Sequence, residues 1–189
     1  TVKAYGARAG DLPFEAMEIT RRAPGPHDVQ IEIAFCGVCH SDLHQVRSEW
    51  PGTLYPCVPG HEIVGRVSAV GAHVKGFTAG DLVGVGCIVD SCQHCEDCDA
   101  GLENYCDDMV GTYNSPIADA PGHTLGGYSQ RIVVHERYVL RIRHPEDQLA
   151  AVESGAVFAE LSADPTLSAA TREALAAVCG VTPAALRVR

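Results

Sequence analysis

The sequence has few basic residues and no long apolar run. Its 189 residues contain 14 Lys and Arg against 24 Asp and Glu, a formal net charge of −10. An acidic chain of this kind is a poor electrostatic match for nucleic acid or for an anionic membrane. No apolar stretch approaches the roughly 18 residues of a membrane span, and the first ten residues lack a signal peptide's apolar core. We therefore expect a cytoplasmic protein that binds neither nucleic acid nor membrane.

The composition is not that of a disordered chain, and the pattern is not that of alternating strands and helices. Hydrophobic residues make up 46% of the sequence, which is ordinary for a globular protein. In the run 29–35, apolar side chains recur at every second position, as in a half-buried strand. Similar runs, most of them near Gly or Pro, are 61–70, 81–86, 128–135 and 138–142. This pattern predicts a mainly β fold, a compact barrel or sandwich.

Two segments have helical character. Residues 39–47 contain no Gly or Pro, so we expect a short helix there. The pattern changes after about residue 150, and 162–180 is typical of one amphipathic helix. Asp164 is placed as its N-cap, Pro165 as its first residue, and Gly180 follows its end.

Four cysteines form the pattern C-x2-C-x2-C-x7-C in a polar loop: Cys92, Cys95, Cys98 and Cys106. Two-residue gaps let successive thiolates turn toward one ion, and four sulfurs suit tetrahedral Zn²⁺ with no position left for a substrate. The spacing therefore predicts a structural zinc site. An iron–sulfur cluster, two disulfides or free surface thiols are the alternatives. His94 lies inside the loop and is expected to be solvated, because four sulfurs already complete the shell.

A second group of candidate ligands lies upstream. Cys39 offers a thiolate, His61 an imidazole and Glu62 a carboxylate, and these three would leave one position of a zinc ion open. Adjacent strand residues point to opposite faces, so His61 and Glu62 can reach one ion only if the backbone is irregular there. The alternatives are a buried thiol, a strand histidine with an ordinary partner and a carboxylate paired elsewhere.

Three residues near Cys39 could support such a site. Ser41 and His44 would share a face of a helix and could carry a proton from a bound alcohol to solvent. Asp42 could accept the second N–H of a ligating histidine and so fix its tautomer. The single tryptophan, Trp50, either lines a substrate pocket or has a packing role.

Taken together, these motifs resemble the zinc-dependent medium-chain alcohol dehydrogenases, most closely their cinnamyl-alcohol-dehydrogenase-like branch. The residues that carry the resemblance are GVCHSDLH at 37–44, the glycine-rich run 60–74 that begins GHE, the four-cysteine loop and GGYSQRIVV at 126–134. The resemblance covers residues 1–152, which it identifies as a GroES-like catalytic domain. Residues 153–189 would then be a helical tail of unknown origin.

The resemblance also implies roles for individual residues. The catalytic-zinc positions are matched by Cys39, His61 and Glu62, and the structural-zinc positions by Cys92, Cys95, Cys98 and Cys106. Ser41 and His44 match the proton relay, and Asp42 matches the partner of the zinc histidine. Cys36, Cys57 and Cys87 match no ligand position and are expected to be buried.

The implied activity is the interconversion of primary alcohols and aldehydes with NADP(H), supported by two Zn²⁺ ions. The sequence departs from the family in two respects. It contains no G-x-G-x-x-G turn, and too few residues follow 152 for a Rossmann domain of about 150 residues. It also has no cysteine just beyond 150 to complete the catalytic site, since the later Cys179 is better placed for a core contact. We therefore expect a chain without the cofactor domain that is inactive alone.

Two other functions remain open. The chain could be a non-catalytic, zinc-stabilised barrel that serves as a relic or an interaction module. It could also be a thiol sensor that uses Cys36 and Cys39, although no thioredoxin-like pattern surrounds that pair. The resemblance leaves the oligomeric state open.

Overall fold

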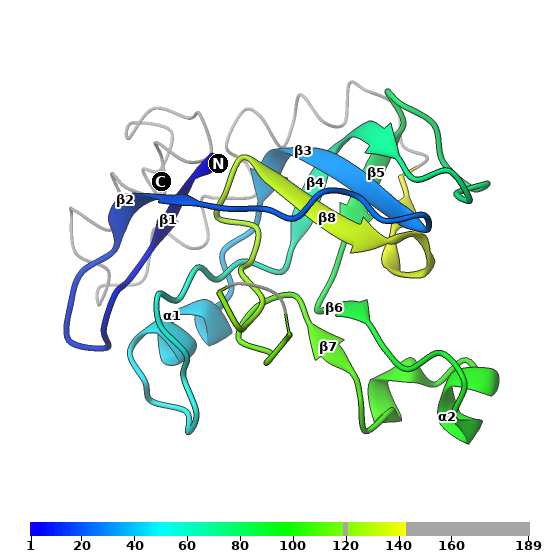
Figure 1. Cartoon of the computed structure of the whole chain (residues 1–189). Coiled ribbons are helices and arrows are strands. Elements are labelled where there is room, and N and C mark those ends of the chain that lie inside the picture. Colours follow the sequence, from blue (N-terminus) through cyan, green and yellow to red (C-terminus); the bar gives the residue numbers. More distant parts are fainter. Residues whose placement is uncertain (119–120, 143–189) are drawn as a thin grey trace, which may run out of the picture.

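The structure is a computed structural model, and residues 1–118 and 121–142 of it are described here (Figure 1). The helix expected at 162–180 and the tail 153–189 lie outside the described residues. Within the described part, no helix is long and apolar enough to cross a membrane.

The described residues are mainly β structure with a few short helices. The strands are β1 (Val2–Gly6), β2 (Glu15–Ile19), β3 (Asp28–Cys36), β4 (Ile63–Val70), β5 (Leu82–Val85), β6 (Ile88–Asp90), β7 (Val110–Gly111), β8 (Arg131–His135) and β9 (Leu140–Arg141). The helices are α1 (His40–Val46) and α2 (Glu96–Asp99), with single 3₁₀ turns η1 (Glu103–Tyr105) and η2 (Glu136–Tyr138). The five strands and the short helix near Cys39 that the sequence predicts are all present, which confirms the mainly β prediction.

The strands form one large antiparallel sheet and two small ones. The five-stranded sheet has the order β8-β3-β4-β5-β9, while β1 pairs with β2 and β6 with β7. β3 lies between β8 and β4, and its alternating apolar residues Val29 and Ile31 are fully buried. The apolar side chains that build the core come from β1, β2 and the strands of the large sheet, and include Val2, Ile19, Val29, Ile31, Val67, Val83, Ile132 and Val134.

A single arginine ties the segment after β2 to the segment before β8. The Arg21 guanidinium donates to the carbonyl oxygens of Leu125 (2.6 Å), Gly126 (2.7 Å) and Arg131 (2.8 Å), and to the Ser129 hydroxyl (2.7 Å). Burial lowers the pKa of this guanidinium to about 10. Arg21 thus supplies donors to three backbone oxygens, and it fixes the glycine-rich segment that supports the site described below.

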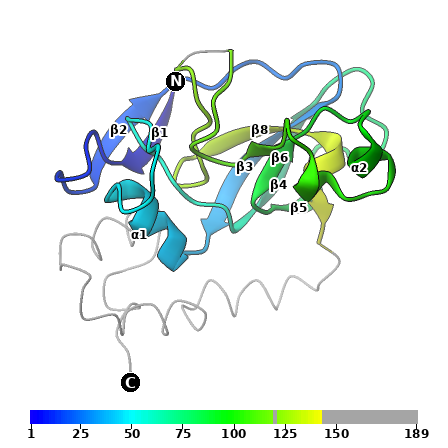
Figure 2. The ribbon, with the colours of Figure 1, turned by 90° about the horizontal axis from the view of Figure 1, so that it is seen from below.

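The two helices mark two separate regions of the molecule. In both views α1 lies away from α2, and the β1–β2 hairpin lies on the opposite side from α2 (Figures 1 and 2). α1 follows β3 directly, whereas α2 belongs to the long loop between β6 and β7. The two groups of candidate metal ligands are therefore built on different parts of the fold.

Candidate metal centres

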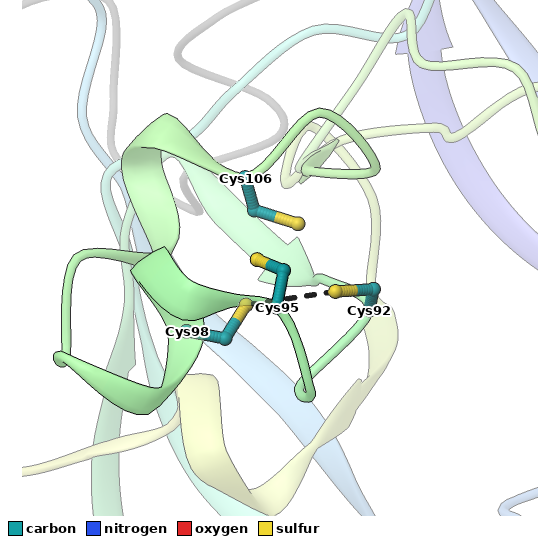
Figure 3. Close-up of side chains that lie close together, drawn as sticks. All are labelled: Cys92, Cys95, Cys98 and Cys106. Carbon is teal, nitrogen blue, oxygen red and sulfur yellow. Dashed lines mark hydrogen bonds between the residues drawn. The ribbon is translucent and has the colours of Figure 1, made fainter.

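The four loop cysteines converge on one point. The sulfur atoms of Cys92, Cys95, Cys98 and Cys106 all lie within 4.8 Å of one another and point inward (Figure 3). Cys92 Sγ and Cys98 Sγ are 3.9 Å apart. Ligands at the usual Zn–S length of about 2.3 Å stand about 3.8 Å apart around a tetrahedral ion. The geometry of the four sulfurs therefore fits zinc.

Short helical turns and one polar network hold this loop in place. Cys95 is the N-cap of α2, and Cys106 ends the turn η1. The Ser91 hydroxyl lies 3.2 Å from Cys98 Sγ, and Arg137 donates to the Cys98 carbonyl oxygen at 3.0 Å. The hydrogen bond from Ser91 lowers the pKa of Cys98 to about 7, which favours the thiolate that a metal requires.

The structure also bears on the alternatives for this loop. All eight cysteines in the described part of the chain are free thiols. The 3.9 Å between the Cys92 and Cys98 sulfurs is far longer than a disulfide bond of about 2.05 Å. His94 is exposed and lies 2.5 Å from the Cys92 carbonyl oxygen, so it is a loop residue, as the sequence predicts.

The second group lies where β3, α1 and β4 meet. Ligand atoms of Cys39, His61 and Glu62 all lie within 4.8 Å of one another. Cys39 is the N-cap of α1, so its side chain is fixed at the start of that helix. His61 and Glu62 precede β4, which begins at Ile63 and not at His61 as the sequence pattern predicts. The irregular backbone that lets both side chains reach one point is therefore the segment before the strand.

Gly60 makes this irregular segment possible. Its φ angle is +101°, a conformation that favours glycine, and a Cβ there would lie 2.6 Å from Tyr128 Cδ1 and 2.8 Å from Cys36 Sγ. The segment is also held by the glycine-rich stretch: Gly126 N–H donates to Val58 O, Gly127 N–H to Gly60 O and Tyr128 N–H to Pro59 O. The GHE and GGY motifs thus serve one purpose, the close approach of two backbones that places His61.

Glycine is needed a second time on the other side of Glu62. Gly37 N–H donates to the Glu62 carbonyl oxygen at 2.8 Å. A Cβ on Gly37 would lie 2.1 Å from Glu62 Oε2, so any side chain at residue 37 would displace the carboxylate from Cys39 and His61. The Gly-x-Cys spacing of the first motif therefore leaves room for the Glu62 carboxylate.

Asp42 is the buried hub of the second group. Its carboxylate is 1% exposed and accepts hydrogen bonds from Cys39 N–H (2.9 Å), Gly60 N–H (3.0 Å) and the Tyr128 hydroxyl (2.9 Å). His61 Nδ1 lies 3.3 Å from the same carboxylate. One side chain thus caps α1, holds the segment before β4 and lies beside the His61 imidazole.

These contacts change the pKa values of two candidate ligands. The hydrogen bond that His61 Nδ1–H donates to Asp42 raises the pKa of His61 to about 9, because the carboxylate favours the imidazolium. The hydrogen bond from the Ser41 hydroxyl lowers the pKa of the Cys39 thiol, and His61 adds to this effect. The group can therefore hold a thiolate beside an imidazolium, and an ion that replaces the imidazole proton would meet a ligand that is already anionic.

The two expected relay residues have different neighbours. Ser41 hydrogen-bonds with Cys39 and with Tyr113, whose ring lies 5.6 Å from the His61 ring. His44 pairs with Glu49, and its ring stacks on Trp50 at 5.3 Å between centroids. No hydrogen bond joins Ser41 to His44 in the described residues.

Sequence reasoning missed two tyrosines that contact this site. Tyr128 is 1% exposed and donates to Asp42, and half-buried Tyr113 contacts both Ser41 and the His61 ring. Burial raises the pKa of the Tyr113 hydroxyl, so this group stays protonated at neutral pH. The position of Tyr128 in the GGYSQ motif was the available signal, whereas Tyr113 has none.

One expectation about the remaining cysteines is wrong. Cys36 and Cys57 are buried, as expected, but Cys87 is exposed. It follows the end of β5, where the chain leaves the large sheet, so no neighbouring strand covers it. Trp50 is also 44% exposed, and its one described ring contact is with His44.

Comparison with known proteins agrees with this geometry. Residues 25–144 match the family model described as "Alcohol dehydrogenase GroES-like domain". The chain is 76% identical over 151 residues to the aldehyde reductase YahK of Escherichia coli K12, covering 80% of this chain and 43% of that protein. It is 56% identical over 145 residues to NADP-dependent alcohol dehydrogenase C 1 of Mycolicibacterium smegmatis, with 75% of this chain and 41% of that protein covered.

Solved structures give the same result. The cinnamyl alcohol dehydrogenase SbCAD4 of Sorghum bicolor superposes with a TM-score of 0.73 at 42% identity, over 84% of this chain and 46% of that one. The CAD of Helicobacter pylori, solved with NADP(H), gives 0.74 at 38% identity, over 85% and 47%. The chain thus spans less than half the length of these relatives. It belongs to the zinc-dependent medium-chain alcohol dehydrogenase family, in the cinnamyl-alcohol-dehydrogenase-like branch, of which it contains the GroES-like domain.

Proposed function

We propose that this chain supplies the catalytic domain of a zinc-dependent alcohol dehydrogenase that interconverts primary alcohols and aldehydes with NADP(H). The observation that supports this most is the convergence of Cys39, His61 and Glu62 around the buried Asp42. The names of the relatives point the same way, since one is an aldehyde reductase and another an NADP-dependent alcohol dehydrogenase. We place the domain at 1–152, as the sequence resemblance implies.

The open group of ligands would carry the chemistry. Zinc held by Cys39, His61 and Glu62 would act as a Lewis acid that lowers the pKa of a bound alcohol. Asp42 holds the proton of His61 on Nδ1, which leaves Nε2 free for the ion. Ser41 stabilises the Cys39 thiolate by hydrogen bonding. Asp42 thus orients the His61 imidazole, and Ser41 favours the charged form of Cys39.

Ser41 and His44 would handle the alcohol proton. The Ser41 hydroxyl, held between Cys39 and Tyr113, can accept a proton at Oγ while it donates its own. His44 Nδ1 is engaged by Glu49, so His44 has Nε2 for proton exchange with solvent. No described hydrogen bond joins the two, so their exchange would pass through a hydroxyl of the bound molecules or through water.

The residues do not fit a nicotinamide dinucleotide. The 189 residues contain no G-x-G-x-x-G turn, the element that receives a pyrophosphate in a Rossmann fold. We therefore expect the 189-residue chain alone to bind zinc and to show no NAD(P)-dependent oxidation of benzyl or cinnamyl alcohol. Turnover at an ordinary enzyme rate by the purified chain would contradict this expectation.

A chimera tests the proposed activity directly. The 151 residues of this chain that match the E. coli relative would replace their counterparts in that protein, which is 76% identical there. We expect the chimera to reduce benzaldehyde or cinnamaldehyde with NADPH, and the variants Cys39→Ser and His61→Gln within it to lose at least 10³-fold in kcat/KM, about 4 kcal/mol. A folded, zinc-loaded chimera without activity would contradict the proposal.

The second candidate is a zinc-stabilised domain without turnover. It is favoured by the four-cysteine site, which needs no substrate position. An inactive chimera that binds zinc only at the four cysteines would support this function. Zinc at both sites together with activity would exclude it.

A further inference from the structure

Three loops bring two histidines and a glutamate together at one end of the five-stranded sheet. His27 lies in the turn before β3, His73 in the turn after β4, and Glu136 follows β8. The start of β3 and the end of β8 are paired, since Asp28 faces His135, and they lie side by side in Figure 1. The pairing of the strands therefore places residues from three loops at the same end of the sheet.

Backbone hydrogen bonds fix the three loops to one another. His73 N–H donates to Pro26 O at 2.8 Å, and Glu136 N–H donates to His27 O at 2.9 Å. The Glu136 carboxylate in turn accepts from the Lys75 N–H at 3.2 Å. The loops that carry the imidazoles are thus held in place before any ligand arrives.

Two imidazole nitrogens face each other in this arrangement. His73 Nδ1 lies 3.3 Å from His27 Nε2, and the ring planes meet at 64°. His27 Nδ1 lies 3.4 Å from Glu136 Oε1. A proton on His27 Nδ1 donates to that carboxylate, so His27 Nε2 keeps its lone pair and accepts from His73 Nδ1–H. This is the carboxylate–histidine pairing that orients imidazoles toward metal ions.

We propose that His27 Nε2 and His73 Nδ1 form a surface site for a divalent transition-metal ion of the Ni²⁺ or Zn²⁺ type. With metal–nitrogen lengths of about 2.1 Å, nitrogens 3.3 Å apart subtend about 100° at the ion, between square and tetrahedral angles. The ion takes both lone pairs, and the His73 proton moves from Nδ1 to Nε2. The His27 side chain is 53% exposed, so an ion can reach the site from solvent.

The site has two protein ligands, and water completes its shell. In the part of the chain that the structure describes, only the two cysteine-containing groups bring three ligand atoms within 4.8 Å. His135 stacks on His27 at 5.8 Å, but its Nδ1 accepts the Arg137 N–H, so that nitrogen is not available to the ion. Because this site has only two protein ligands, we expect it to bind a metal ion more weakly than either cysteine-containing group does.

The test uses Ni²⁺ and the full chain after its cysteine sites are loaded with zinc. Ni²⁺ is titrated while imidazole signals are followed by ¹H–¹⁵N NMR, which locates the ion by paramagnetic broadening. We expect the signals of His27, His73 and His135 to broaden first. Broadening that begins at His61 or in the cysteine loop, or none at all, would overturn the proposal.

Three variants separate a site from general surface binding. His73→Gln should weaken Ni²⁺ binding at this edge at least tenfold, and Glu136→Gln should weaken it about tenfold, because that carboxylate orients His27. His135→Gln is the matched control and should stay within twofold of the wild type. Unchanged affinity in His73→Gln, or an equal loss in His135→Gln, would overturn the two-nitrogen assignment, and melting curves of all variants verify that each is folded.

Discussion

Asp42 contacts four different parts of the candidate catalytic group. It binds the start of α1, the segment before β4, Tyr128 and His61. Asp42→Asn keeps the size but removes the charge and one acceptor. We expect a loss of about 2–3 kcal/mol in unfolding free energy, and roughly 10–100-fold weaker zinc binding at Cys39 and His61, by denaturant melts and metal titration.

Tyr128→Phe is the control for that change. It removes one donor to Asp42 and leaves the contact between Asp42 and His61 intact. We expect it to cost about 1 kcal/mol, with zinc affinity within a few-fold of the wild type. If both variants lost zinc equally, orientation of His61 by Asp42 would not be the reason.

Two glycines with positive φ test how the GHE segment is built. Gly60 has φ +101° and is crowded by Tyr128 and Cys36, whereas Gly52 has φ +82° and no atom within 4 Å of an added Cβ. Gly52→Ala should cost only backbone strain, about 1 kcal/mol. Gly60→Ala adds the clash and should cost about 3 kcal/mol or more in denaturant melts. Similar losses would mean that crowding at Gly60 contributes nothing.

At the scale of elements, the loop between β6 and β7 depends on its metal. The loop is short of apolar side chains, and α2 and η1 are single turns that would not persist alone. Cys95→Ser should therefore lower the melting temperature by roughly 10 °C, equivalent to about 3 kcal/mol. His61→Gln should lower it less, because the other group is open.

Cys87→Ser is the matched control for Cys95→Ser. Cys87 is exposed and lies outside both groups of ligands, so its replacement should leave the melting temperature unchanged. Equal losses in Cys95→Ser and His61→Gln would refute the division into a structural and a catalytic site. So would a loss in Cys87→Ser as large as that in Cys95→Ser.

The contact between β5 and β9 gives a pH dependence. Arg141 of β9 binds the Asp81 carboxylate, which also accepts from Thr78 N–H at 2.8 Å, and together they lower the pKa of Asp81. A depressed pKa stabilises the fold above the ordinary value near 4, and this contribution is lost as the pH falls through the folded pKa. Asp81→Asn should therefore reduce the fall in melting temperature that the wild type shows as the pH is lowered below about 4.

The comparison for Asp81 is Asp11, an exposed carboxylate to which the described structure gives no hydrogen bond or ion pair. Asp11→Asn should leave the dependence of melting temperature on pH as it is in the wild type. If the melting temperature fell equally steeply at low pH in Asp81→Asn and in the wild type, the contact with Arg141 would not contribute to stability.

The sequence predicts much of this fold because the signals are local. The alternation at 29–35, the Gly- and Pro-free run 39–47 and the cysteine spacing each depend on a few neighbouring residues, and the structure has β3, α1 and the converging sulfurs there. The β4 boundary was misplaced by two residues, because the φ angle of Gly60 overrides the apolar pattern at His61.

Contacts between residues far apart in the sequence could not be predicted in this way. Tyr113 approaches His61 and Tyr128 approaches Asp42 only through tertiary packing, and neither contact has a spacing rule. The exposure of Cys87 depends likewise on where β5 leaves the sheet. The pair His27 and His73 is 46 residues apart and meets through the register of the large sheet.

At the scale of the whole molecule, residues 1–118 and 121–142 contain two groups of three or more candidate metal ligands, and the chain spans less than half the length of the relatives compared above. The groups differ in one physical respect: the four sulfurs close a shell, and Cys39, His61 and Glu62 leave it open. We therefore expect the four-cysteine group to hold a structural ion and the other group an ion with an open position.

Zinc content, measured with and without Cys95→Ser, tests this view most directly. The purified wild-type chain, dialysed against excess zinc and then metal-free buffer, should hold two zinc ions under thiol-reducing conditions. Cys95→Ser should keep the ion at Cys39 and His61 and lose the other. Wild-type chain that retains no zinc, with its loop sulfurs oxidised to one another once reductant is removed, would contradict the account.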